Sequence, residues 1–234
     1  MKDNLEILIL LFYYNRPNLV KNALNSIKEN TYNNYKIAFI DDGSDIKGEE
    51  IINEFYKNDF NNKIIFYNTN DTKEEKIKRG GSIFGMYANT AIEELKSDII
   101  IMLCDDDALT PNYLFDLNNF YQNNQDIKYS YSHIIEFNPL IETYKNKEKK
   151  YNILNHCNPI NPYHMVDASQ VSFRLECYYN NIKFPYPLTK NLDAHIYSLL
   201  YLKYGNCIYN NITGQYKAIH ENQLGKTDSY DIIN

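Results

Sequence analysis

Ile99-Ile100-Ile101-Met102-Leu103-Cys104-Asp105-Asp106-Asp107 is the stretch in which an apolar run ends directly on three carboxylates. An uninterrupted apolar run of this length is typical of a strand that is buried on both faces of a parallel sheet. The aspartates therefore stand where the strand leaves the core, although neighbouring carboxylates repel one another and burial raises that cost. Carboxylate oxygens in this position suit a hard divalent cation such as Mg²⁺ or Mn²⁺. A solvated acidic turn without a ligand is the alternative.

The composition is that of an ordinary globular chain. It has 234 residues, of which 44% are hydrophobic and 23% charged, and this supports a sizeable core. A net charge of −6 argues against a broad grip on nucleic-acid phosphates. The four cysteines are widely spaced without a Cys-x-x-Cys pair, so no zinc site is expected. No apolar run approaches the roughly 18 residues of a membrane span, and no signal peptide is visible.

Strands and helices alternate along the first half of the sequence. Strands are expected at 7–14, 36–40, 63–67 and 98–103, and helices after Pro17 and at 49–56, 82–95 and 111–123. This order predicts an α/β fold with an open, mostly parallel, Rossmann-like sheet and helices on both faces. Ligands of such folds bind at the carboxyl ends of the strands, so we expect Tyr14, Asp42 and Asp105 to share one crevice.

The second half is less regular. A strand at 129–137, an edge strand at 170–174, a helix at 192–204 and short strands at 207–209 and 215–219 are expected. The segment 138–152 is polar and rich in lysine. We interpret it as a loop or mobile arm that either gathers an anionic ligand or is simply solvated. Because no linker separates the halves, we expect a single domain over 1–234.

Four motifs, in this order, resemble glycosyltransferase family 2, the inverting nucleotide-sugar transferases of GT-A fold. They are Tyr14-Asn15-Arg16-Pro17, Asp41-Asp42-Gly43-Ser44, Gly85-Met86-Tyr87-Ala88-Asn89-Thr90-Ala91, and Asp105-Asp106-Asp107 followed by Pro111. The resemblance covers roughly residues 5–125. It implies that 1–125 is the nucleotide-sugar-binding half and that 126–234 is the acceptor-side half.

The resemblance also implies a donor site and a metal site. The implied donor-binding residues are Tyr14, Arg16, Asp41, Asp42, Arg79, Asp105 and Asp106. Tyr14 would contact the nucleobase, Asp41 or Asp42 would accept from the base edge, and Arg79 would touch the diphosphate. The alternatives are core packing for Tyr14, turn capping for the two aspartates and a solvated loop charge for Arg79. The implied ligands of Mn²⁺ or Mg²⁺ are Asp105, Asp107 and His220, although His220 also fits a surface position.

By the same resemblance, Asp193 is the general base that takes the proton of the acceptor hydroxyl. The family has a Glu-Asp pair at this point, and here Leu192 stands in place of the glutamate. An aspartate at a helix start also has a purely structural use in capping. Asp167 and Glu176 are the next candidates for the base.

The predicted function is metal-dependent, inverting transfer of a sugar from a nucleotide-sugar, by resemblance a UDP-sugar, to a hydroxyl acceptor. The processive Gln-x-x-Arg-Trp signature is absent, which favours a single transfer. The acceptor is either a bacterial surface glycan or a hydroxymethylated DNA base, since a composition rich in Asn, Tyr, Lys and Ile also suits a phage enzyme. We expect a cytoplasmic location in a bacterium or a virus-infected cell. A catalytically silent nucleotide-sugar-binding module is the rival; a sugar nucleotidyltransferase is disfavoured, because no Gly-rich loop follows the first strand.

Overall fold

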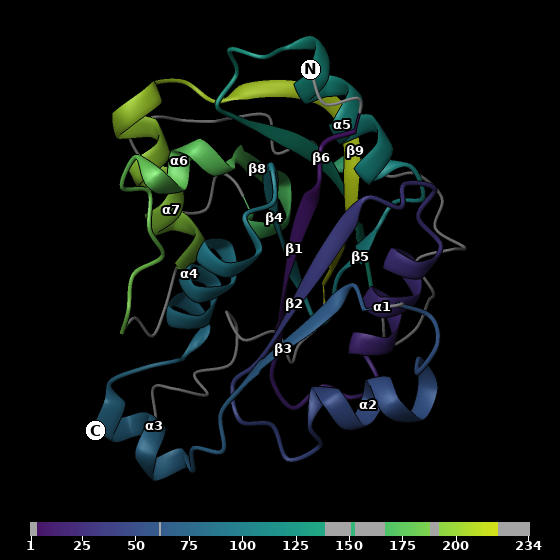
Figure 1. Cartoon of the computed structure of the whole chain (residues 1–234), viewed down its shortest axis with the longest axis vertical. Helices are drawn as coiled ribbons and strands as arrows, with labels where there is room; N and C mark the ends of the chain where they lie inside the picture. Colours follow the sequence, from purple (N-terminus) through teal and green to yellow (C-terminus); the bar gives the residue numbers. More distant parts are fainter. Residues whose placement is uncertain (1–3, 61, 139–150, 153–166, 188–191, 220–234) are drawn as a thin grey trace.

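The computed structural model describes residues 4–60, 62–138, 151–152, 167–187 and 192–219 (Figure 1). Its strands are β1 (Ile7–Tyr13), β2 (Tyr35–Asp41), β3 (Ile64–Asn68), β4 (Ile99–Cys104), β5 (Ala108–Leu109), β6 (Tyr129–Phe137), β7 (Tyr151–Asn152), β8 (Val171–Arg174) and β9 (Ile208–Ala218). Its helices are α1 (Val20–Lys28), α2 (Gly48–Phe55), α3 (Lys73–Arg79), α4 (Phe84–Leu95), α5 (Tyr113–Asn123), α6 (Leu175–Tyr179) and α7 (Leu192–Tyr204), with a 3₁₀ turn, η2, at Ala168–Gln170.

The strands form one mixed sheet in the order β3-β2-β1-β4-β8-β6-β9-β5, with β7 paired to β6. β1 runs parallel to both β2 and β4, with Tyr13 opposite Asp41 and Phe12 opposite Cys104. β6 and β9 are also parallel, whereas β8 and β5 run antiparallel to their neighbours. The predicted mostly parallel α/β sheet is confirmed. Its register brings the carboxyl ends of β1, β2 and β4 to one edge.

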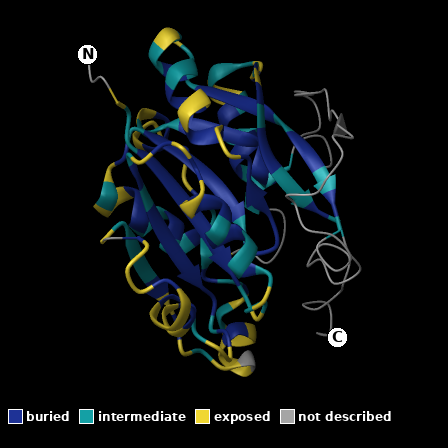
Figure 2. Ribbon diagram, turned by 90° about the vertical axis from the view of Figure 1, so that its right-hand side faces the viewer, coloured by how far each residue is buried: buried dark blue, intermediate teal, exposed yellow. Residues whose placement is uncertain are grey.

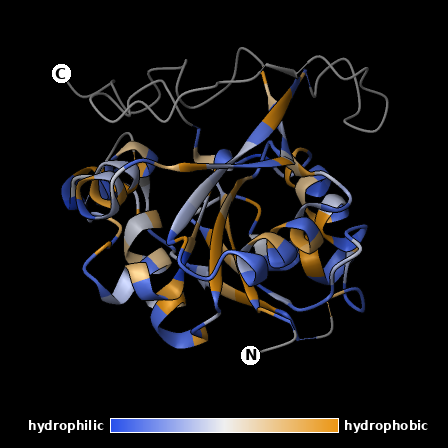
Figure 3. Ribbon diagram, turned by 90° about the horizontal axis from the view of Figure 1, so that it is seen from above, coloured by the Kyte–Doolittle hydropathy of each residue, from blue (hydrophilic) through white to orange (hydrophobic). Residues whose placement is uncertain are grey.

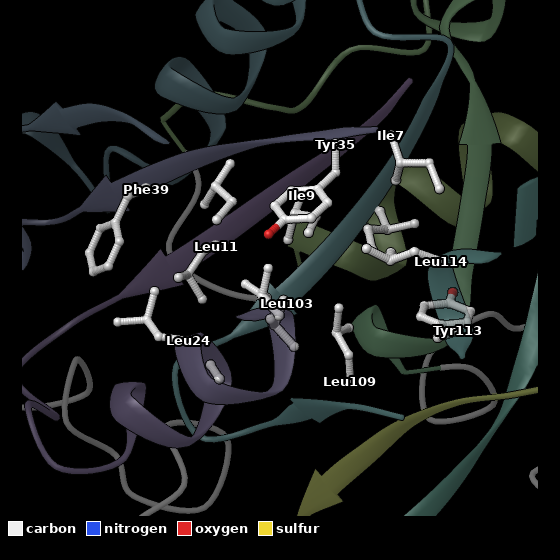
Figure 4. Packing of buried hydrophobic residues seen from close by; sticks show 14 of the residues in the cluster. Ile7, Ile9, Leu11, Leu24, Tyr35, Phe39, Leu103, Leu109, Tyr113 and Leu114 are labelled. Carbon is white, nitrogen blue, oxygen red and sulfur yellow. The ribbon is translucent and has the colours of Figure 1, made fainter. Parts of the chain in front are cut away.

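The apolar strands alternate between two cores. Ile7, Ile9 and Leu11 of β1 belong to the core that also contains buried residues of α1, α2 and α5, and Figure 4 shows side chains from β1, β2, β4, α1 and α5 packing there. Leu8 and Leu10 belong to the opposite core, with residues of α4, α6 and α7. A strand whose residues all find apolar partners on both faces reads as an unbroken apolar run.

The helices cover both faces of the sheet, as expected. Figure 1 shows α1 and α2 on one side and α4, α6 and α7 on the other. In Figure 2 most of the sheet is dark blue, with teal stretches on some strands, and the exposed yellow positions gather mainly on helices and connecting segments. Seen from above in Figure 3, orange strands lie between helices that carry blue residues. No helix among the described residues is both long and apolar enough to cross a membrane.

Three local expectations are corrected. β8 is not an edge strand but lies between β4 and β6. The two short strands expected near the end of the chain are one continuous strand, β9, whose pairing with β6 tolerates two register shifts. No helix is expected between the strand at 63–67 and the helix at 82–95, yet α3 lies there. Thr72 and Glu75 form a capping box at its start, and Gly80 ends it at φ +82°. Positions 139–150 of the lysine-rich segment lie outside the described residues.

Candidate active site

Two carboxylates of the aspartate triplet share one guanidinium. Arg16 Nη1 donates to Asp105 Oδ1 at 2.9 Å and to Asp106 Oδ2 at 2.8 Å. The backbone N–H of Tyr14 donates to Asp105 Oδ2 at 2.9 Å, so the β1 and β4 ends are tied together as the register requires. Burial, together with the neighbouring charge of Asp106, raises the pKa of Asp105 to about 7. Arg16, predicted to bind the donor, is thus the counter-charge of Asp105 and Asp106.

Asp107, the third carboxylate, is held by β9. Its Oδ1 accepts the backbone N–H of Ala218 at 2.9 Å, and its Oδ2 lies 3.2 Å from the Nζ of Lys217. The same Nζ lies 3.3 Å from Asp167 Oδ1. Burial raises the pKa of Asp107 to about 8, although the Lys217 charge lowers it. Burial alone would lower the pKa of Lys217, but Asp107 and Asp167 raise it well above its usual value.

Asp193 lies in the first turn of α7, near enough to Asp167 and Lys217 for their charges to act on its carboxyl group. Burial, and then the charge of Asp167, raise the pKa of Asp193. Asp167 caps η2, where its Oδ1 accepts the Ser169 N–H at 3.0 Å, and its carbonyl accepts from the Tyr197 hydroxyl of α7 at 2.6 Å. Burial opposes ionisation of Asp167, yet Lys217 and Ser169 lower its pKa overall. Of the two carboxylates, Asp193 is therefore the better proton acceptor near neutral pH.

Asp41 supports the loop that follows β2. Its carboxylate accepts the backbone N–H groups of Ser44 at 2.8 Å and Gly48 at 3.0 Å, and the residue is 2% exposed. This is the turn-capping alternative. A contact between Asp41 and the donor stays a prediction.

Asp42 and Tyr14 contact side chains of α3. Asp42 Oδ1 accepts from Arg79 Nη2 and from the Ile83 N–H, each at 3.2 Å. Lys76 Nζ donates to the Asp42 carbonyl and lies 4.1 Å from the centre of the Tyr14 ring. Tyr14 is only half-buried, so its ring is not a core side chain. The residues predicted for nucleobase and diphosphate contact are thus gathered at one edge of the sheet, with Lys76 added.

The Gly85–Ala91 motif on α4 positions the segment that leads toward α7. Asn89 Nδ2 donates to the Phe184 carbonyl at 2.8 Å, and the Phe184 N–H donates to Asn89 Oδ1 at 2.9 Å. A Cβ on Gly85 would lie 2.1 Å from the Pro185 carbonyl oxygen and 3.3 Å from Leu192 Cδ1. Leu192, where the family has a glutamate, is therefore a packing residue against α4.

The cluster can accommodate a divalent cation. Ligand atoms of Cys104, Asp106 and Asp107 lie within 4.8 Å of one another. Ion pairs join Asp105 and Asp106 to Arg16, and Asp107 and Asp167 to Lys217. The charges of Asp167 and Lys217 also act on Asp193. Carboxylate oxygens suit Mg²⁺ or Mn²⁺, whereas the thiol does not. His220, a predicted ligand, lies outside the described residues.

Sequence reasoning missed Lys217 and Lys76. The capping box at Thr72 and Glu75 could have revealed α3, and with it the one-turn spacing of Lys76 and Arg79. Nothing in the sequence pairs Lys217 with a carboxylate 110 positions earlier. Glu176, considered as a base, instead pairs with Lys128 at 2.9 Å on the surface.

The comparisons with known proteins agree with this geometry. Residues 8–83 match the family model described as Glycosyl transferase family 2, which confirms the predicted resemblance for that part of the chain. No curated protein matches the sequence significantly.

Solved structures extend the likeness to nearly the whole chain. TarS from S. aureus, residues 1–349 in complex with UDP-GlcNAc, is 17% identical with a TM-score of 0.66, over 93% of this chain and 60% of that one. A second, longer structure of S. aureus TarS is 16% identical at the same TM-score, over 92% of this chain and 37% of that one. The mannosyltransferase PcManGT from Pyrobaculum calidifontis, in complex with GDP-Man and Mn²⁺, is 12% identical with a TM-score of 0.64, over 94% of this chain and 59% of that one. These likenesses confirm the GT-A fold. The chain spans less than two thirds of each of these proteins.

Proposed function

We propose that this chain is a glycosyltransferase that moves a sugar from a nucleotide-sugar donor to an acceptor hydroxyl with inversion at the anomeric carbon. The observation that supports the proposal is that Lys217 links Asp107 of the triplet to Asp167, whose charge also acts on Asp193. One sheet runs through both halves of the chain, which supports a single domain with donor and acceptor sides.

The donor would lie along the ends of β1, β2 and β4. Tyr14 offers a half-buried ring, Asp42 a carboxylate, and Lys76 and Arg79 positive charge. This arrangement suits a nucleoside diphosphate, whose base stacks on an aromatic ring and whose phosphates need cations. UDP-sugars are our first choice; UDP-GlcNAc and GDP-Man, bound by the structural neighbours, are the donors to test.

Asp107, with Asp106 and Asp105 beside it, would hold the predicted Mn²⁺ or Mg²⁺. When bound, such an ion offsets the negative charge of a departing nucleoside diphosphate. The carboxylates of the triplet must be held in place for this. Arg16 and the backbone N–H groups of Tyr14 and Ala218 hold them by hydrogen bonds.

Asp193 would act on the acceptor. The acceptor oxygen forms a bond to the anomeric carbon from the face opposite the diphosphate, and the bond from that carbon to the diphosphate oxygen breaks. The hydroxyl proton passes to Asp193, whose raised pKa brings it closer to the working pH of a general base. The acceptor itself, a surface glycan or a hydroxymethylated DNA base, stays open.

Substitution of Asp193 tests the proposal. Asp193→Asn keeps the shape of the side chain but cannot take the proton, so turnover should fall roughly 10²-fold or more. Release of UDP from UDP-GlcNAc, or of GDP from GDP-Man, measures turnover with water in place of the unknown acceptor. Donor affinity, measured by calorimetry, should not change.

The exposed Asp126 supplies the matched control, and Asp126→Asn should behave as wild type. Wild-type turnover in Asp193→Asn would move the base to Asp167. If the wild-type protein binds the nucleotide yet consumes no donor, the rival, a silent nucleotide-sugar-binding module, is correct.

A further inference from the structure

Lys217 is a half-buried cation inside the carboxylate cluster. It lies near the end of β9 opposite Glu136 of β6, and its side chain is 15% exposed. Its Nζ bridges Asp107 Oδ2 at 3.2 Å and Asp167 Oδ1 at 3.3 Å. A single ammonium therefore links Asp107 to Asp167, whose charge acts on Asp193.

β9 engages both oxygens of Asp107. The Ala218 N–H donates to Oδ1 at 2.9 Å, and the Lys217 ammonium donates to Oδ2. β5 and β9 pair antiparallel with Ala108 opposite Tyr216, so the backbone fixes this arrangement. The carboxyl group of Asp107 thus already has a cation of the chain as its partner.

A divalent ion at Asp107 would stand a few ångströms from the ammonium, and like charges at that distance repel strongly in a buried site. We propose that the Lys217 ammonium occupies the cation position at Asp107, and that a divalent ion binds there only when the ammonium withdraws to Asp167. The inference rests on the proposed function only for the expectation that a metal binds the triplet.

Asp167 is suited to receive the displaced ammonium. It already lies 3.3 Å from Nζ, and its position is fixed by Ser169 and by the Tyr197 hydroxyl. The ammonium therefore keeps a carboxylate partner throughout. It follows that the metal alone binds weakly, and that a donor diphosphate, which adds negative charge and oxygen ligands, favours its entry.

Titration with Mn²⁺ alone, without any nucleotide, tests the inference. The electron paramagnetic resonance signal of free Mn²⁺ reports the bound fraction directly, independent of turnover. Lys217→Met removes the charge at similar length, and its affinity for Mn²⁺ should exceed that of wild type roughly tenfold or more, within the usual range of coupling between two ligands. Lys217→Arg keeps the charge and should retain the weak wild-type affinity.

Controls locate the effect. Lys128→Met removes a lysine from an ion pair outside the cluster and should leave Mn²⁺ affinity unchanged. The double variant Lys217→Met with Asp107→Asn should lose the gain. Lys217→Gln serves as a second neutral variant should Lys217→Met fail to fold.

An unchanged or weaker Mn²⁺ affinity in a folded neutral variant would overturn the inference, as would an equal gain in Lys217→Arg. Since no donor is present, a protein that turns out to transfer no sugar can still pass or fail this test. Failure here likewise leaves the Asp193→Asn experiment intact.

Discussion

Replacing Asp41 by alanine should destabilise the fold rather than selectively weaken donor binding. The carboxylate is 2% exposed and accepts two backbone N–H groups, from Ser44 and from Gly48 at the start of α2. Ser44 in turn accepts the Asn15 N–H at 3.0 Å. Loss of Asp41 therefore loosens the β2–α2 loop and, through Ser44, the segment that carries Tyr14.

The magnitude follows from the two hydrogen bonds. A bond to a charged group contributes about 1.5–3 kcal/mol, and a buried donor left without a partner costs about 1–3 kcal/mol. Allowing for water entry and relaxation, Asp41→Ala should cost about 3–5 kcal/mol. For a chain of this size that corresponds to a fall in Tm of roughly 6–20 °C. Asp41→Asn keeps one acceptor and should lose about half as much.

Thermal unfolding followed by circular dichroism measures these shifts, with UDP affinity measured well below both values of Tm. Asp45→Ala on the same loop is the control, because Asp45 is exposed, and its Tm should match wild type. A Tm for Asp41→Ala within about 2 °C of wild type, less than the shift expected for 1 kcal/mol, would refute this reasoning. Weakened UDP binding with unchanged stability would instead make Asp41 a direct ligand.

Two further predictions follow from the charged cluster. The charge of Asp167 raises the pKa of Asp193. Asp167→Asn removes that charge but keeps an acceptor for Ser169, so it should move the acid limb of the turnover–pH profile to lower pH. A shift to higher pH would contradict the assignment of Asp193 as the general base. The pKa values of Asp105 and Asp107 are raised in the fold to about 7 and about 8, so stability present below their unfolded pKa is lost as pH rises through these values. The Tm of the metal-free protein should therefore fall as the pH rises from the ordinary carboxyl pKa of 3.8 to about 8, and level off above that. The fall should shrink in Asp107→Asn, and an equal fall in both proteins would exclude Asp107 as its source.

Much of the first half of the fold can be predicted because β1, β2 and β4 are buried on both faces. The side chains of Ile7–Tyr13 pack alternately into two cores. All of them are therefore hydrophobic, and the strand is an uninterrupted apolar run in the sequence. The second half lacks this signal. β8, with four residues, is too short for periodicity to distinguish an edge strand from an internal one, because its place depends on β4 and β6, which the sequence separates from it.

The positions of Tyr14, Asp42 and Asp105 could be predicted because parallel strands bring their carboxyl ends to one edge. What each side chain does there could not. Asp41 and Asp42 are adjacent in sequence, yet Asp41 turns to the loop N–H groups and Asp42 to Arg79. Side chains that alternate between the two faces of a strand end face different partners, and those partners are set by α2 and α3.

Lys217 shows why the remaining part of the site is hidden from the sequence. Which face of a strand a residue occupies depends on register, and a slip by one residue exchanges the faces. The pairing of β6 with β9 shifts register between Tyr131 and Ile134 before it sets Glu136 opposite Lys217. Had β9 continued without those shifts, Lys217 would have a different partner on β6, and its approach to Asp107 would not follow from the strand pattern. The charge balance of the carboxylate cluster thus depends on an irregularity in strand pairing that hydrophobic periodicity does not record.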